Sequence, residues 1–366
     1  MIKKQWLLIA LCMAVSVMAE FHNAYFFGCS TTDQFVALPE ILAGSGDSVE
    51  YVKYTVPGCG MECLYKAVGV PASFRGKSWY CMTAAPFANG TELGVNNDVK
   101  YISYWYDVAL QSNPDCILYV YGMYPGSRWN SCPWYCDLSY DEFWSTHWNR
   151  TIDTSLQVWQ QPAGGYGTEA YQFMMVKVLR EKYPGKKIYM MGVAHVMNAF
   201  EQAPFPGFSY MWPADKPNER IEVTGARGLF YDDIHLNNYG QYLQCLTAYA
   251  TIFRKHPAAA GSHFKGGYGY YDATVPDTFA ARAKDFVWNT LTSSALTGYT
   301  GVSGTSVVTP PAAAITPVRQ AVTPSGLFTL DGRNALTVAG EGRKGGNPAG
   351  VYVITRDGLR AAQFSR

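Results

Sequence analysis

The chain has 366 residues, of which 48% are hydrophobic and only 16% are charged. This length can bury a sizeable core and exceeds one typical domain. Its 27 Tyr, 18 Phe and 10 Trp exclude disorder for most of the chain. The formal charge is +1, from 29 basic and 28 acidic residues, so there is no basic excess to hold a phosphate backbone and no nucleic-acid partner is expected. A chain poor in charge and rich in Tyr and Trp is typical of extracellular proteins that meet neutral polar ligands.

Residues 1–19 are predicted to be a signal peptide. Two lysines near the start precede an apolar stretch at 6–17, and the small residues Val17 and Ala19 stand where a signal peptidase cleaves. The stretch is shorter than the ~20 residues of a spanning helix, so we expect cleavage after Ala19 and no stable membrane span. The protein is therefore predicted to be secreted or held at the cell surface.

The cysteines agree with export. Of nine cysteines, Cys12 leaves with the signal peptide, and the remaining eight form an even set that suggests disulfides in an oxidising compartment. Those eight are Cys29, Cys59, Cys63, Cys81, Cys116, Cys132, Cys136 and Cys245. The pairs Cys59/Cys63 and Cys132/Cys136 are spaced more widely than the usual two-residue zinc knuckle, so no metal site is expected. Cys116 and Cys245 lie in apolar stretches and are expected to be buried free thiols.

From residue 20 to 298 the sequence alternates between apolar runs and amphipathic stretches. The expected strands are 24–27, 51–56, 116–121 and 188–193, and the expected helices are 98–112, 169–182 and 238–254. The continuous apolar run at 116–121 is typical of a strand buried on both faces. This alternation predicts an α/β domain over 20–298, with a parallel sheet covered by helices on both faces.

The composition changes after residue 298. Residues 299–325 are rich in Pro, Thr and Ala and are predicted to be a linker. Residues 326–366 are predicted to form a small β tail. Its expected strands are 327–330 and 351–354. The stretches 331–333 and 348–354 resemble the C-terminal sorting domain of type IX secretion substrates, which implies secretion machinery as a partner; the alternative is an accessory β module.

Two short segments carry candidate chemistry. The first is Gly28-Cys29-Ser30, directly behind an apolar strand, where the carboxyl edge of an α/β sheet builds sites. The second runs from Asp232 to His235, just before an amphipathic helix. A carboxylate three residues before an imidazole can bind one ring nitrogen and leave the other to take a proton from a nucleophile. Taken singly, Ser30 could be a turn or cap residue and His235 a surface residue beside a helix cap at Asn237 or Asn238.

Together the two segments resemble the SGNH (GDSL-type) hydrolase family. The resemblance implies a three-layer α/β/α flavodoxin-like sandwich and an esterase that needs no cofactor. It implies Ser30 as the nucleophile, His235 as general base and acid, and Asp232 as the orienting carboxylate. Asp233 is the competing carboxylate, although its two-residue offset fits the pattern less well.

The resemblance also implies three donors for the oxyanion of an acyl-transfer intermediate. They are the N–H of Ser30, a Gly after the second strand, and an Asn after the third. Gly58 is the expected second donor and Gly60 its alternative. The run 116–121 is taken as the third strand, so Tyr124 stands in the place of the Asn; the alternatives are Asn130 or no third donor.

A Trp-rich segment at 126–167 follows this strand. Its Trp side chains either stack on sugar rings or pack the segment onto the sheet, and Trp129 and Trp134 are candidate substrate-binding residues. His195 either lines the cleft or is structural. The sequence thus predicts a secreted serine esterase that removes acyl groups, acetyl first among them, from a polysaccharide or oligosaccharide. The alternative is a non-catalytic carbohydrate-binding or cell-surface protein on the same scaffold.

Overall fold

The structure is a computed structural model. It describes residues 19–86, 92–125, 144–145, 148–149, 169–212, 218, 221–232, 234–265, 272–299, 351–355 and 358–362. Of the predicted signal peptide only residue 19 is among them. The chain divides into two units, residues 1–310 and 311–366, which are described separately.

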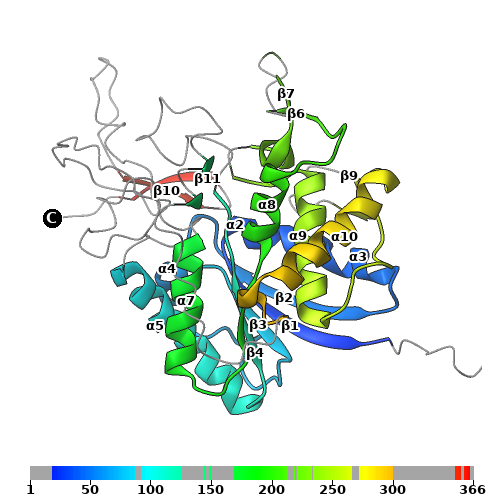
Figure 1. The fold of residues 1–366 in the computed structure, drawn as a ribbon. Coiled ribbons are helices and arrows are strands. Elements are labelled where there is room, and N and C mark those ends of the chain that lie inside the picture. The colour runs from blue at the N-terminus through cyan, green and yellow to red at the C-terminus, as the bar shows by residue number, and fades with distance from the viewer. Residues whose placement is uncertain are drawn as a thin grey trace, which may run out of the picture. The chain divides into compact units, whose positions relative to one another are not determined.

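Five apolar runs of the first unit form a parallel sheet with the order β2-β1-β3-β4-β5 (Figure 1). The strands are β1 Phe21–Gly28, β2 Ser48–Thr55, β3 Cys81–Ala84, β4 Ile117–Tyr121 and β5 Ile188–Met191. This is the strand order of the flavodoxin-like fold. The order reverses at β1, because the chain moves from β1 to β2 on one side and then to β3 on the other. Residues that end β1 therefore lie at the switch point, where open α/β folds bind ligands.

Helices cover both faces of the sheet, so the unit is an α/β/α sandwich (Figure 1). One face packs against α4 Met61–Val68, α5 Glu92–Ser112 and α7 Glu169–Lys182. The other packs against α3 Leu38–Ala43, α8 Val193–Gln202, α9 Asn238–Phe253 and α10 Asp277–Ser293. Short elements complete the unit: α2 Ser30–Asp33, the 3-10 helices η1 Gln34–Ala37, η6 Gly225–Leu229 and η7 Ala295–Thr297, and the hairpins β6 Tyr210–Trp212 with β7 Ile221–Val223 and β8 His263–Lys265 with β9 Asp272–Thr274.

Alternation along the strands divides the core into two clusters. In β1, Ala24 and Phe26 belong to the core on the α9 face, whereas Tyr25 and Phe27 belong to the core on the α5 face. All four side chains are fully buried, as expected for a central strand with helices on both sides. The packing on both faces holds β1 firmly, and with it the residues that follow its carboxyl end.

The predicted fold class is confirmed, with one strand missed. The expected strands at 24–27, 51–56, 116–121 and 188–193 all exist, although Val193 already begins α8. The missed strand is β3, Cys81–Ala84, which has only four residues and little β-branched character. Consequently 116–121 is the fourth strand of the sheet, not the third. The helix at 238–254 is also not the last, because α10 follows it.

The second unit contains an antiparallel hairpin, β10 Val351–Thr355 with β11 Gly358–Ala362. The strand predicted at 351–354 is confirmed, and its partner is the segment just after it. The strand predicted at 327–330 and nearly all of the predicted linker lie outside the described residues. A sorting role for this tail stays a prediction.

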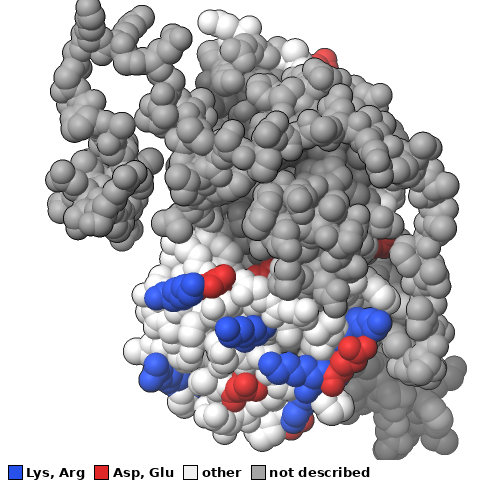
Figure 2. All heavy atoms as spheres, turned by 90° about the vertical axis from the view of Figure 1, so that its left-hand side faces the viewer, with Lys and Arg blue, Asp and Glu red and all other residues white. Residues whose placement is uncertain are grey.

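Charges are few and mixed on the surface. On the described part of the face in Figure 2, basic and acidic side chains lie among a majority of uncharged ones. Within the described ranges, no helix has both the length and the apolar character needed to cross a membrane.

Candidate active site

Ser30 stands at the first position of α2, two residues beyond the buried strand β1. The chain turns sharply here, with the Thr32 N–H donating to the Cys29 carbonyl at 2.9 Å. The turn requires glycine at position 28, because a Cβ there would lie 2.8 Å from the Thr32 Cβ and 2.9 Å from the Ala85 Cβ. The small residue thus lets the chain carry Ser30 out over the carboxyl edge of the sheet.

His235 lies in a tight loop between η6 and α9. Phe230 and Leu236 form an antiparallel bridge at the base of the loop, and the Tyr231 N–H donates to the His235 carbonyl at 2.8 Å. Asn237 caps α9, since its side chain accepts from the N–H groups at Tyr239 and Gly240. The predicted cap is therefore real. It coexists with a positioned His235, so the two interpretations of this segment are not exclusive.

The fold brings Ser30, His235 and Asp232 into one hydrogen-bonded chain. His235 Nε2 lies 2.9 Å from Ser30 Oγ, and His235 Nδ1 lies 2.7 Å from Asp232 Oδ2. The second carboxylate oxygen, Oδ1, accepts from the Ile234 and His235 N–H groups at 2.8 and 2.7 Å. One oxygen of Asp232 therefore shapes the loop while the other orients the imidazole. Asp233, the competing carboxylate, lies outside the described residues.

Asp232 is held as a carboxylate. Burial acts to raise its pKa, but the hydrogen bond and charge of His235 and the backbone N–H groups of Ile234 and His235 outweigh burial, so the pKa of Asp232 is lowered. An ionised partner at Nδ1 fixes the ring tautomer and leaves Nε2 to accept a proton from Ser30.

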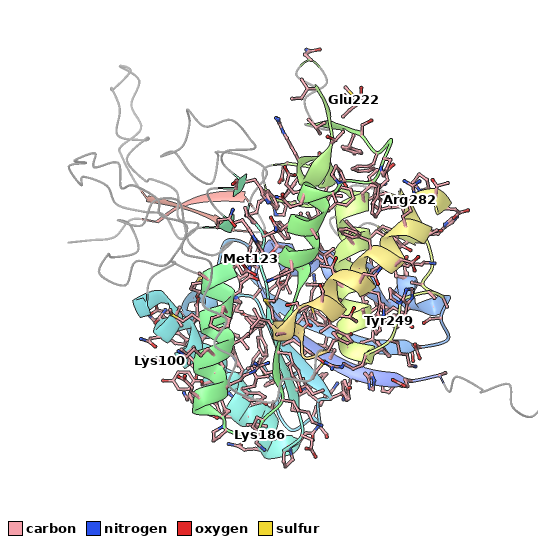
Figure 3. All side chains as sticks on the ribbon, in the orientation of Figure 1. Lys100, Met123, Lys186, Glu222, Tyr249 and Arg282 are labelled. Carbon is pink, nitrogen blue, oxygen red and sulfur yellow. A yellow bond between two sulfur atoms is a disulfide. The ribbon has the colours of Figure 1, made fainter. Side chains whose placement is uncertain are left out.

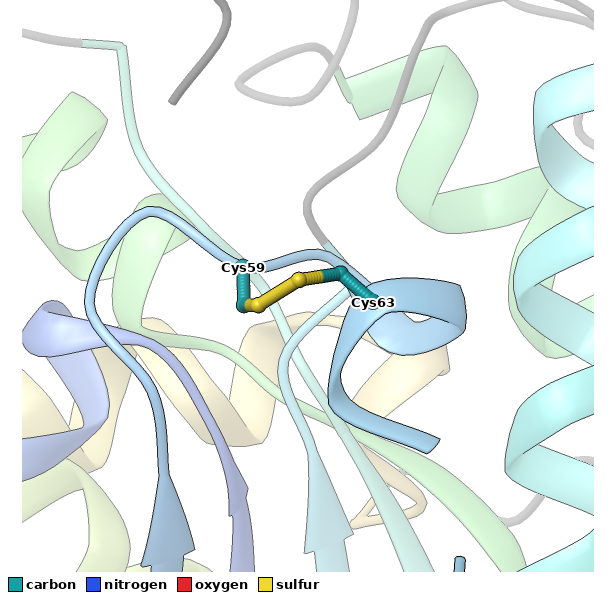
Figure 4. The surroundings of a disulfide bond; sticks show 2 residues. All are labelled: Cys59 and Cys63. Atoms are coloured by element: carbon teal, nitrogen blue, oxygen red, sulfur yellow. A yellow bond between two sulfur atoms is a disulfide. The ribbon is translucent and has the colours of Figure 1, made fainter. Parts of the chain in front are cut away.

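The turn after β2 lies beside the nucleophile turn. The Val56 N–H donates to the Gly28 carbonyl at 3.1 Å, and the Cys59 N–H donates back to the Val56 carbonyl at 3.1 Å. Gly58 has a φ of 70°, which with Pro57 before it fits a type II turn. Gly60 caps α4 with extended backbone. A disulfide between Cys59 and Cys63 joins this turn to the first turn of α4 (Figure 4).

Tyr124 does not fit the predicted oxyanion role. Its hydroxyl lies 3.2 Å from the Ile234 carbonyl, to which it donates, and 3.4 Å from Gln34 Oε1. The side chain is fully buried and packs edge-on against Phe230. A phenol has only one proton, and here the Ile234 carbonyl of the His235 loop and Gln34 Oε1 are its acceptors. Tyr124 is thus a support under that loop.

The error follows from the missed strand. Tyr124 follows β4, just beyond Met123 (labelled in Figure 3), whereas the position after the third strand is the loop beyond Ala84. That loop starts beside the nucleophile, since the Ala85 N–H donates to the Phe27 carbonyl at 3.0 Å. The first Asn after it is Asn89, which lies outside the described residues, as does Asn130.

Two tryptophans of the Trp-rich segment pack inward. Trp144 is buried and donates from Nε1 to Asn198 Oδ1 at 3.0 Å, and Trp148 is buried against the His195 ring. His195 Nε2 lies 3.2 Å from Glu169 Oε1, and this hydrogen bond lowers the pKa of Glu169. For these residues the packing alternative is confirmed. The candidate substrate-binding residues Trp129 and Trp134 lie outside the described residues.

The buried thiols predicted at Cys116 and Cys245 are confirmed, and Cys29 and Cys81 are also free and buried. Burial raises the pKa of the Cys29 thiol beside Ser30, which keeps it protonated and a poor nucleophile. Cys132 and Cys136 are not among the described residues. Within the described part of the chain, no group of three or more His, Cys, Asp or Glu is placed to hold a metal ion.

No protein-family model matches the sequence, and no curated protein matches it. A DUF4886 family protein from Bacteroides uniformis has 9% identity and a TM-score of 0.46, over 74% of this chain and 94% of that one. A GDSL-like lipase from Bacteroides thetaiotaomicron has 10% identity and a TM-score of 0.34, over 69% and 97% of the two chains. A family 3 carbohydrate esterase from Clostridium thermocellum has 12% identity and a TM-score of 0.33, over 63% and 94%. Similarity this low assigns neither a family nor an activity, so the function has to be inferred from the site.

Proposed function

We propose that this protein is a serine ester hydrolase that forms an acyl-enzyme on Ser30. The observation that carries the proposal is the hydrogen-bonded chain from Asp232 through His235 to Ser30, at 2.7 and 2.9 Å. Nucleophile, base and orienting carboxylate within such distances are the recognisable arrangement of nucleophilic acyl transfer.

The reaction follows from the positions of the atoms. Ser30 Oγ attacks the ester carbonyl carbon as its proton passes to His235 Nε2. The tetrahedral intermediate expels the alcohol oxygen, which takes this proton, and leaves the acyl group on Ser30. Water then attacks the acyl carbon, gives its proton to His235, and the acid departs as Ser30 is reprotonated. Asp232 stays ionised throughout and stabilises the imidazolium. The Ser30 N–H and the turn at Gly58 are the proposed oxyanion donors.

The first experiment uses p-nitrophenyl acetate and a serine-reactive phosphonate. We expect hydrolysis, and we expect mass spectrometry to locate the phosphonate on Ser30. The Ser30→Ala variant should neither hydrolyse the ester nor be labelled. An unlabelled and inactive wild-type protein would reject the proposal and favour the non-catalytic carbohydrate-binding alternative.

The proposed substrate is an acyl ester, acetyl first among them, on a polysaccharide or oligosaccharide. Support comes from the sequence, which is poor in charge and carries Trp129 and Trp134 in the segment after β4. Release of acetate from a panel of acetylated glycans, compared with hydrolysis of long-chain p-nitrophenyl esters, tests this. Faster turnover of the long-chain esters would indicate a lipid substrate instead.

Export is proposed on the predicted signal peptide at 1–19 and on the Cys59–Cys63 disulfide, a bond typical of oxidising compartments. N-terminal sequencing of protein recovered outside the cell should start at Glu20. Recovery only inside the cell, with residues 1–19 retained, would contradict it.

A further inference from the structure

Gln34 lies four residues after Ser30, at the start of η1, and its side chain is fully buried. A buried primary amide is costly unless both its N–H and its C=O find partners. The partners of Gln34 are not in its own helix. They lie in the loop that carries His235, about 200 residues further along the chain.

The Gln34 side chain pairs with both backbone groups of Leu236. Its Nε2 donates to the Leu236 carbonyl at 2.8 Å, and its Oε1 accepts from the Leu236 N–H at 3.2 Å. The orientation of the amide is fixed by this pairing, because a flipped amide would set donor against donor and acceptor against acceptor. Gln34 Oε1 also lies 3.4 Å from the Tyr124 hydroxyl, whose single proton it shares with the Ile234 carbonyl.

This pairing connects the two segments whose separation sets the site. Ser30 begins the short helix that runs into Gln34, and His235 immediately precedes Leu236. The 2.9 Å contact between Ser30 Oγ and His235 Nε2 joins two side chains from segments about 200 residues apart, so its length depends on how those segments are held together. Two hydrogen bonds from one buried amide fix the segment that follows Ser30 against the backbone of the His235 loop.

We propose that Gln34 is a positioning residue for the proposed ester hydrolysis: it holds His235 at hydrogen-bond distance from Ser30 through the backbone of Leu236. Gln34 does not touch the substrate or the reacting atoms. Its contribution is alignment, and displacements of about 1 Å in such a contact can cost about a hundredfold in rate. The inference rests on the proposed function for its kinetic test, and on geometry alone for its spectroscopic test.

The test compares Gln34→Met with Gln172→Met. Met keeps the shape of Gln and removes both hydrogen-bonding groups. Gln172 is the matched control, because it is equally buried and donates to the Met123 carbonyl at 2.6 Å from α7, on the opposite face of the sheet. We expect Gln34→Met to lower kcat on p-nitrophenyl acetate by about a hundredfold with KM nearly unchanged, and to slow phosphonate labelling of Ser30 in the same ratio. Gln172→Met should also lose thermal stability but keep its kcat.

A second readout does not depend on turnover. In ¹⁵N NMR spectra of the full-length protein, the His235 Nε2 shift should change in Ser30→Ala, which removes the hydrogen-bond partner, and Gln34→Met should reproduce that change. Gln172→Met should not. Should Gln34→Met fail to fold, Gln34→Asn, which keeps the amide but is one methylene shorter, takes its place with the same expectations.

The outcomes separate the two proposals. A folded Gln34→Met protein with wild-type kcat and a wild-type His235 signal would overturn the positioning role. Equal losses of kcat in both Gln variants would do the same, since general destabilisation would then explain them. A wild-type protein that hydrolyses no ester would overturn the proposed function, while the NMR comparison would still decide whether Gln34 sets the contact between Ser30 and His235.

Discussion

The two faces of the sheet bury polar groups in different ways. On the α9 face, buried Gln side chains connect segments far apart in sequence: Gln34 donates to the Leu236 carbonyl, and Gln244 donates to the Thr31 carbonyl at 3.0 Å. The buried Asn237 acts locally, as the cap of α9. On the α5 face the core is mainly aromatic and aliphatic. Its buried carboxylate, Asp98, accepts from the Tyr171 hydroxyl at 2.6 Å and from the Met61 N–H at the start of α4.

This difference shows where the orientation of one segment relative to another has to be fixed. An apolar core fixes the distance between elements but not the orientation of a loop, because dispersion contacts are not directional. The segments that carry Ser30 and His235 meet on the α9 face, where directional hydrogen bonds hold them. Buried polar groups of the α5 face, among them Asp98 and Gln172, also form hydrogen bonds, but these do not join the segment of Ser30 to that of His235. Variants on each face should therefore fail in different ways, in activity on one and in stability on the other.

The largest effect is expected for Ser30→Ala on the α9 face. Removing the nucleophile should lower kcat by several orders of magnitude, and the melting temperature should stay near that of the wild type, because the lost hydroxyl is only partly buried. Kinetics on p-nitrophenyl acetate and calorimetry on the same samples check this. Retention of more than about a tenth of the wild-type rate would show that another group is the nucleophile.

Next comes Asp232→Asn, expected to lower kcat by about 10³–10⁴-fold, because an amide cannot stabilise the imidazolium and favours the wrong tautomer. Asp233→Asn is the matched control and should change kcat little. In the wild type kcat/KM should fall as pH drops, since His235 must be neutral to accept the serine proton. The folded-state pKa of Asp232 is lowered, so the stability that it contributes is present at neutral pH and is lost as pH falls through the acid range. A large loss of kcat in Asp233→Asn, together with a normal kcat in Asp232→Asn, would reverse the carboxylate assignment.

Much of this arrangement could be predicted from sequence, because it depends on local signals. An apolar strand that ends in Gly28 places Ser30, and the three-residue offset from Asp232 to His235 allows the carboxylate to reach Nδ1. The helices at 169–182 and 238–254 were predicted within one residue of their observed ends. What failed was the number of strands, because β3 was missed. The strand β3 has too few residues to show a pattern, and its omission moved the expected third donor to Tyr124.

Long-range pairings could not be predicted. Nothing around Gln34 indicates that its amide meets Leu236, because that contact arises only when α2 and the His235 loop fold against the same end of the sheet. The burial of α9 is a second example. Its spacing indicates one apolar face, yet nearly every residue is buried, including Gln241, Gln244 and Thr247, since α3, η1, α8 and α10 all pack against this helix.

On the α5 face, Asp98→Asn should affect stability and its pH dependence. Burial raises the pKa of Asp98 to about 7, against the opposing hydrogen bonds from Tyr171 and the Met61 N–H. Such a carboxyl contributes its full stabilisation below its pKa in the unfolded chain, ~4. As pH rises from there toward 7, the free energy of unfolding falls by up to about 4 kcal/mol. Asn at position 98 cannot ionise, so Asp98→Asn should remove this decline.

Urea unfolding at pH 5 and pH 8 measures the decline in the free energy of unfolding. The control is Asp107→Asn, an exposed position on the same helix. An identical decline in Asp98→Asn would contradict the assignment.

Tyr124→Phe should have a smaller effect, less than about tenfold in kcat, because it removes only the hydroxyl's bond to the Ile234 carbonyl and its longer contact with Gln34 Oε1, and leaves the Gln34–Leu236 pairing in place. A loss of a hundredfold or more, the size seen when one oxyanion donor is removed, would restore Tyr124 as a donor. The measurement is kcat and KM on a soluble acetyl ester. A displaced loop would lower kcat, whereas weakened substrate binding would raise KM.

The smallest effect is expected from removing the C-terminal region. Contacts hold the chain as far as Tyr299, whose hydroxyl bonds to the Ala250 carbonyl and whose ring lies 4.3 Å from the Arg254 guanidinium. The fully buried Thr297 donates its hydroxyl proton back to the Leu291 carbonyl at 2.7 Å.

A chain that ends after Thr300 keeps these contacts and should match the full-length protein in melting temperature and in kcat/KM on p-nitrophenyl acetate. A chain that ends after Ser294 loses them and should melt at a lower temperature, because Arg254 at the end of α9 is left without these partners. Equal stability of the two shortened chains would show that residues 295–300 contribute nothing to the fold. Loss of activity in the longer one would show that the catalytic unit requires residues beyond 300.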